Sequence, residues 1–249
     1  MRRREARRRR KEAGASARKK FRELRREKIR ASWRDWVVIV VAIALLVAAI
    51  VILSGVPALV FAALVGAFVT LAGIVWMIGG DVHSLTWIWG AVGEEATAEA
   101  LGALDDSWTF EHDLQHDHGN WDHVVVGPAG IFLLETKNLS AKAVVRHDAL
   151  AAGSMLFRGG GLRRAAARLS ERFGSHLDRS PWVQPVFVVW GTFPHGSSEA
   201  NGVVYVRGDE LIPWLAEQPQ RLTASQFESA VAALRDLRAD RRDHECALR

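Results

Sequence analysis

The chain has 249 residues, of which 49% are hydrophobic, and this length is sufficient for one domain of ordinary size and an additional segment. Its formal net charge is +5, with the basic residues concentrated at the N-terminus. The single cysteine, Cys246, excludes an intrachain disulfide and agrees with a reducing compartment.

A basic arm is predicted over residues 1–35. Residues 1–34 hold 17 Lys and Arg against 4 Glu, a net charge of +13, whereas the rest of the chain has a net charge of −8. A segment with so many charges and so few apolar residues is expected to be mobile or transiently helical. We expect the arm to lie on anionic membrane lipids. A nucleic-acid-binding tail is the alternative, because the same arginines can neutralise phosphates.

Two uncharged apolar stretches follow the arm. Residues 36–53 and 58–78 have the length of helices that cross a hydrocarbon core of roughly 30 Å. The short link between them contains Gly55 and Pro57, so we predict a transmembrane helical hairpin over residues 36–78. Because a basic arm resists export, the protein is expected at the cell membrane with both termini in the cytoplasm.

The soluble part is expected to begin near Gly90 and to form a mixed α/β domain with a mostly antiparallel sheet. Apolar periodicity predicts helices over residues 93–104, 161–174, 208–217 and 223–241. It predicts strands over residues 108–113, 183–191 and 203–207, and two more within residues 122–138. Residues 114–121 are predicted to be a polar loop.

The stretch DHVVVGPAGIFLLETKN, residues 122–138, is the most informative part of the sequence. If Pro128 and Ala129 form a two-residue loop, Asp122 lies directly opposite Glu135. Residues two apart on a strand point the same way, so Lys137 joins the two carboxylates on one face. A bulge at Gly130 would shift this register by one residue, and the sequence leaves both registers open.

The two strands of this hairpin are apolar on both faces, which predicts helices on both sides of the sheet. Ionisable groups at the end of such a covered sheet are unlike ordinary surface charges. Lys137 is one of only two lysines among the 16 basic residues after Arg34, the other being Lys142. This rarity favours a role for a flexible ammonium at Lys137.

The segments GEEATAEAL and GNWDHVVVGPAGIFLLETKN resemble the nuclease-related domain NERD, a branch of the PD-(D/E)xK nuclease-like superfamily. The resemblance covers roughly residues 90–195 and implies a restriction-endonuclease-like mixed sheet flanked by helices, which residues 196–249 complete. It implies that Asp122 and Glu135 hold a divalent metal and that Lys137 assists the nucleophile. Glu94, or Glu95 in its place, would complete the catalytic set.

Converging carboxylates suit Mg²⁺ or Mn²⁺, so we expect a divalent-metal site that hydrolyses nucleic acid and needs no small-molecule cofactor. Two alternatives stay open. Lys137 could simply neutralise Glu135 or Asp122 at a salt-bridged sheet end. The fold could also serve as a catalytically inactive binding or regulatory module at the membrane, since many relatives carry a Gln that the helix over residues 161–174 lacks.

The histidines of EHDLQHDHGNWDH, residues 111–123, raise a further possibility. His116 and His118 could suggest a zinc site. No cysteine accompanies them, and a polar loop collects such residues as solvated surface, so we expect no zinc site here.

Overall fold

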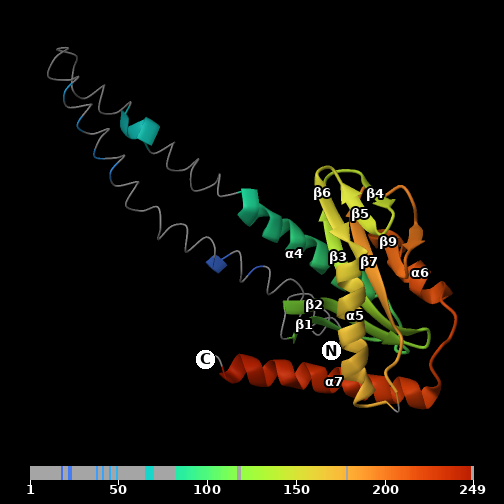
Figure 1. Cartoon of the computed structure of the whole chain (residues 1–249). Coiled ribbons are helices and arrows are strands. Elements are labelled where there is room, and N and C mark those ends of the chain that lie inside the picture. Colours follow the sequence, from blue (N-terminus) through green and yellow to red (C-terminus); the bar gives the residue numbers. More distant parts are fainter. Residues whose placement is uncertain are drawn as a thin grey trace. The chain divides into compact units, whose positions relative to one another are not determined.

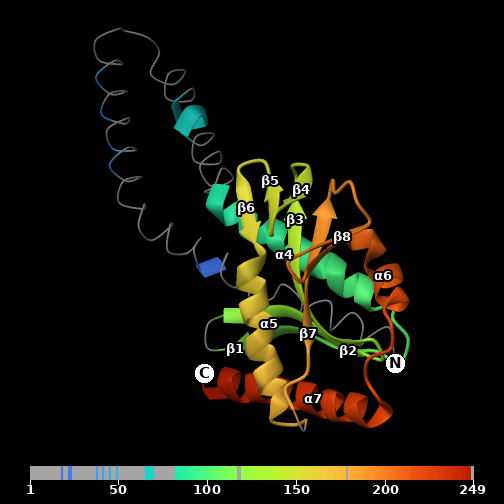
Figure 2. The ribbon, with the colours of Figure 1, turned by 45° about the vertical axis from the view of Figure 1, so that its right-hand side comes forward.

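The computed structural model describes residues 82–116, 119–177 and 179–247, together with Arg18, Arg22, Glu23, Val38, Val41, Leu45, Ala49 and residues 65–69. Trp89 and the described residues that follow it belong to one compact unit, whose elements are labelled in Figures 1 and 2. The fold below is that of this unit.

The predicted basic arm, residues 1–35, and the predicted membrane hairpin, residues 36–78, lie almost entirely outside the described residues. Within the described part of the chain, no helix combines the length and the apolar character needed to cross a bilayer. The arm and the two spans therefore stay predictions.

A mixed six-stranded sheet forms the centre of the unit, in the strand order β1-β2-β3-β7-β9-β8. The strands are β1 Thr109–His116, β2 Gly119–Gly127, β3 Gly130–Leu139, β7 Val183–Gly191, β8 Ser197–Ala200 and β9 Val203–Arg207. β7 runs parallel to both of its neighbours, β3 and β9, whereas the other pairs are antiparallel. Three of the five strand pairs are thus antiparallel, as expected, but the centre of the sheet around β7 is parallel. The mixed sheet implied by the resemblance is confirmed.

The β2–β3 hairpin has the register of a two-residue loop. Gly127 pairs with Gly130 around Pro128 and Ala129, and the ladder continues without a slip to His123 and Leu134. Gly130 has a φ of +131°, a conformation that L side chains rarely adopt, which explains a glycine directly after the turn. The predicted register is therefore confirmed over residues 123–134, and the alternative with a one-residue shift is wrong there. The predicted pair of Asp122 and Glu135 lies beyond the end of this ladder.

Helices cover both faces of the sheet, as the apolar strands predict. They are α4 Val82–Leu101, α5 Gly159–Gly174, α6 Leu211–Glu217 and α7 Ala224–Ala247, with a short 3₁₀ turn, η1, at Gly208–Glu210. Val124 and Leu133 pack with α5 and α7 on one face. Val125 and Leu134 pack with α4 and α6 on the other. The alternation along β2 and β3 thus assigns each side chain to one of two cores.

A second, three-stranded sheet was not predicted. Its strands are β4 Ala143–Arg146, β5 Ala149–Ala152 and β6 Met155–Arg158. They are too short to show a clear apolar alternation in the sequence. Figures 1 and 2 show this sheet at the end of the main sheet from which α5 starts.

The predicted polar loop over residues 114–121 is wrong. β1 continues to His116 and β2 begins at Gly119, so the two strands form a long hairpin. Polar side chains of this hairpin have partners: Arg238 of α7 donates to Glu111 of β1 at 2.7 Å, and Asn120 of β2 donates to Asp113 of β1. These partners come from elsewhere in the fold or from the facing strand, so local sequence patterns do not reveal them.

Candidate functional site

The site begins where β2 and β3 separate. Their ladder ends at His123 and Leu134, although β3 continues beside β7 as far as Leu139. Just beyond the ladder, the main-chain N–H of Thr136 donates to Oδ2 of Asp122 at 2.8 Å. The Asp122 carboxylate thus takes the place of a main-chain acceptor, which fixes it at the mouth of the diverging strands.

Glu135 and Lys137 lie on the same face of β3 as the core residue Leu133, two and four residues earlier. Nζ of Lys137 donates to Oε1 of Glu135 at 2.7 Å, and both side chains are mostly buried, with 22% and 32% of their surface exposed. Nζ also lies 5.1 Å from the ring centroid of Phe157 on β6. The small sheet therefore supplies an apolar wall beside the ammonium group.

Helix α4 packs tightly against the end of β3. A Cβ at Gly93 would lie 2.8 Å from Cβ of Asn138, so only glycine permits this approach. One turn later, the hydroxyls of Thr97 and Thr136 are 3.0 Å apart, and the indole N–H of Trp190 donates to the Thr97 hydroxyl at 2.8 Å. These contacts hold the α4 backbone in place immediately next to Glu94.

Asp122 is in a strongly unfavourable environment for a negative charge. Burial is the main cause that raises its pKa well above the usual range, followed by the charges of Glu135 and Glu94. Lys137 and the N–H of Thr136 oppose this rise without cancelling it. The carboxylates are therefore close enough to repel one another, and the nearby ammonium group does not compensate for them.

The pKa of Lys137 is raised above its usual value. Burial lowers it, but Glu135, Asp122 and Glu94 together outweigh that effect. The ammonium group therefore stays protonated at neutral pH and can donate hydrogen bonds. The charge of Glu94 raises the pKa of both Asp122 and Lys137, whereas Glu95 contributes to neither shift.

The four predicted site residues, Glu94, Asp122, Glu135 and Lys137, are thus brought together electrostatically from α4, β2 and β3. Among the residues that the structure describes, no group of three or more His, Cys, Asp or Glu side chains has a metal-binding arrangement. Mg²⁺ is often held by one or two protein carboxylates with water and phosphate as further ligands, so a pair such as Asp122 and Glu135 suffices chemically.

Two histidines beside the site were wrongly expected to be solvated. His112 of β1 and His123 of β2 are directly opposite each other, are buried, and have their Nδ1 atoms 2.6 Å apart. At this distance one ring donates and the other accepts. Burial, followed by the neighbouring His112, lowers the pKa of His123 well below its usual value.

We expect this histidine pair to make the protein acid-sensitive. The unfolded chain binds a proton at a histidine near pH 6.5, whereas folded His123 resists it, so the free energy of unfolding should fall as the pH drops below about 6.5. Asp122 has the opposite effect on the free energy of unfolding. Because its pKa is raised in the folded state, protonation of its carboxylate at low pH stabilises the fold. Urea unfolding of wild type and His123→Gln at pH 7.5 and pH 5.5 separates the two effects.

The wild type should lose more stability than His123→Gln between these pH values, and exposed His195→Gln should behave as wild type. Equal losses in all three proteins would contradict a neutral, buried His123.

Among the comparisons with known proteins, the one with family models found a match. Residues 89–189 match the family model of NERD, the nuclease-related domain. No curated protein and no solved structure gave a match. Over residues 89–189 the chain is therefore similar to the nuclease-related domain, and this segment contains Glu94, Asp122, Glu135 and Lys137.

Proposed function

We propose that the protein is a divalent-metal-dependent nuclease whose site consists of Glu94, Asp122, Glu135 and Lys137. The observation that carries this function is the electrostatic environment of Asp122. Its carboxylate is fixed by the N–H of Thr136, and its pKa is raised because burial and the charges of Glu135 and Glu94 disfavour its ionised form. A divalent cation would favour that ionised form, and it would do so where a nuclease-related domain is matched.

Asp122 and Glu135 would hold the metal, because they come from the two strands that separate at the site. Carboxylate oxygens suit Mg²⁺ or Mn²⁺. When bound, such an ion would supply Lewis-acid polarisation of a phosphodiester. Asp122 is fixed for this role by the N–H of Thr136, and Glu94 would complete the site from α4 through its charge.

Lys137 would act as a cation and hydrogen-bond donor. Its raised pKa keeps it protonated, so it suits the stabilisation of negative charge on an attacked phosphate better than the removal of a proton. The bond to Glu135 and the ring of Phe157 restrict its position in the absence of substrate.

Hydrolysis of nucleic acid by the full-length protein tests this function. Labelled single-stranded and double-stranded DNA and RNA are incubated with Mg²⁺, Mn²⁺ or EDTA. We expect cleavage of at least one substrate with Mg²⁺ or Mn²⁺ and none with EDTA. Binding without cleavage under all metal conditions would contradict the catalytic function.

A second candidate is a catalytically inactive binding or regulatory module on the same fold. The observation that favours it is the direct ion pair between Lys137 and Glu135, which satisfies one predicted metal ligand without a metal. Binding without cleavage in the assay above would favour this module.

We further propose that residues 36–53 and 58–78 anchor the protein in the cell membrane and that the basic residues 1–34 contact anionic lipids. Reporters fused at Met1 and Arg249 should then both report a cytoplasmic location, because the net charge of +13 resists export and a hairpin returns the chain to the same side. Activity of a periplasmic or extracellular reporter at either end would contradict this topology.

A further inference from the structure

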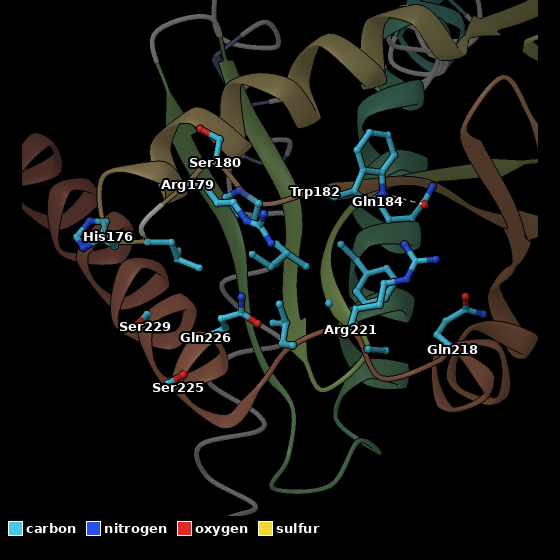
Figure 3. A pocket seen from close by; sticks show the side chains of 17 residues that line it. His176, Arg179, Ser180, Trp182, Gln184, Gln218, Arg221, Ser225, Gln226 and Ser229 are labelled. Atoms are coloured by element: carbon cyan, nitrogen blue, oxygen red, sulfur yellow. Dashed lines mark hydrogen bonds between the residues drawn. The ribbon is translucent and has the colours of Figure 1, made fainter.

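A second candidate site lies at the other end of β3. A cavity of about 830 Å³ opens beside the β2–β3 turn and is lined by the segments after α5 and before α7, by the start of β7 and by the first turns of α7. Figure 3 shows its polar side chains, which include Arg179, Trp182, Gln184 and Arg221. A rise of roughly 3.3 Å per strand residue places Ile131, in its wall, about 13 Å from Glu135, so this cavity is separate from the proposed metal site.

The described residues that line this cavity carry a net positive charge. Arg179 and Arg221 are exposed, and neither guanidinium has an ion-pair partner among the residues that the structure describes. By contrast, Arg207 and Arg238 are paired with carboxylates. None of the described residues that line the cavity is an Asp or a Glu. Two uncompensated guanidinium groups in such surroundings favour an anionic ligand, above all a phosphate.

An exposed aromatic ring lies at the same cavity. Trp182 is 62% exposed, although burial of its ring would be favourable. Its indole N–H donates to Oε1 of Gln184 at 3.3 Å, and the amide of Gln184 donates in turn to the carbonyl of Gly202 at 3.1 Å. This chain of hydrogen bonds orients the indole and leaves its face available for stacking with a planar ligand.

Hydrogen bonds anchor the segments that carry Arg221 and Trp182. The N–H of Arg221 donates to the carbonyl of Pro128 in the β2–β3 turn at 2.9 Å. Next to Trp182, the carbonyl of Pro181 accepts from the Ser170 hydroxyl of α5 at 2.5 Å. Anchored backbone at Arg221 and beside Trp182 reduces the reorganisation that ligand binding requires.

We propose that this cavity binds a nucleoside phosphate, with the phosphate on Arg179 and Arg221 and the base stacked on Trp182. Its volume is within the usual range for small-molecule sites, and the combination of unpaired guanidinium groups with an exposed indole matches the two parts of a nucleotide. The bound nucleoside phosphate belongs either to a free mononucleotide or to the 5′-phosphorylated end of a nucleic acid strand. This site is independent of the proposed nuclease function, because it contains none of the metal-site residues.

Isothermal titration calorimetry of the full-length protein in EDTA tests the proposal without hydrolysis. The titrants are the four ribonucleoside 5′-monophosphates, adenosine, inorganic phosphate, and a short oligonucleotide with and without a 5′-phosphate. Binding of mononucleotides indicates a free nucleotide, whereas binding of only the 5′-phosphorylated oligonucleotide indicates a strand end. Adenosine and inorganic phosphate should each bind at least about tenfold more weakly than the best nucleotide, since adenosine lacks the phosphate and inorganic phosphate lacks the base.

The variants Trp182→Ala, Arg179→Gln and Arg221→Gln should each weaken this binding by about tenfold or more. Matched controls are Trp89→Ala, whose ring is also 62% exposed, and Arg164→Gln, an exposed arginine outside the cavity. Both controls should bind as wild type does. The proposal is overturned if no phosphorylated titrant binds, if the cavity variants bind as tightly as the controls, or if inorganic phosphate binds as tightly as the best nucleotide.

Discussion

Replacing Asp122 with Asn is expected to lower metal-dependent hydrolysis by at least about a hundredfold while leaving the metal-free protein as stable as wild type or more stable. The pKa of Asp122 is raised because burial, Glu135 and Glu94 disfavour its charge, so a neutral side chain relieves repulsion. Asn keeps an oxygen that can accept the N–H of Thr136. Urea unfolding in EDTA and an activity assay in Mn²⁺ measure the two effects.

Exposed Glu199→Gln is a matched control and should change neither quantity. Glu135→Gln should lose activity to a similar extent, but its stability should change little, because it also removes the direct ionic partner of Lys137. A fall of about 1 to 3 kcal/mol in the unfolding free energy of metal-free Asp122→Asn would instead indicate a salt-bridged sheet end.

Replacing Lys137 with Met is expected to abolish hydrolysis and also to destabilise the metal-free protein, by about 1 to 3 kcal/mol. The ammonium group lowers the pKa of Asp122 and donates to Glu135 directly at 2.7 Å. Its removal takes away a positive charge that favours the ionised forms of these two carboxylates in a mostly buried site. The loss should be measured by urea unfolding at pH 7.

The pH dependence provides a second readout. Because the folded pKa of Lys137 is raised, its stabilisation is complete below its unfolded pKa of about 10.5 and is lost as the pH rises through the folded value. The stability difference between wild type and Lys137→Met should therefore narrow above about pH 10.5. Exposed Lys142→Met should match wild type throughout, and equal stability of Lys137→Met and wild type at pH 7 would contradict the electrostatic account.

The strands with strong apolar runs could be predicted from the sequence. β7 and β9 begin and end at the predicted residues, and the Pro128-Ala129 loop sets the β2–β3 register as expected. The hairpin at residues 114–121 was missed because its polar side chains hide the strand pattern and find partners in the folded state, as Asn120 does with Asp113. The small sheet was missed because its strands are only four residues long.

The predicted site residues are brought together because strand alternation and one tight turn determine where Asp122, Glu135 and Lys137 point. Whether Glu94 or Glu95 affects the charges of Asp122 and Lys137 depends on how α4 packs on β3. Gly93 and Thr97 determine this packing through contacts with residues distant in sequence. The same holds for Phe157 beside Lys137. A sequence pattern identifies these residue types, but only the packing of separate elements selects among them.

The effect of Mn²⁺ on thermal unfolding tests the central claim most directly. Full-length wild type, Asp122→Asn and Glu135→Gln are melted in EDTA and in increasing Mn²⁺, since an ion that binds only the folded state raises Tm with its concentration. A metal site at Asp122 and Glu135 predicts a Mn²⁺-dependent rise in the wild type that is absent from both variants. No rise in the wild type, or the same rise in all three proteins, would contradict it.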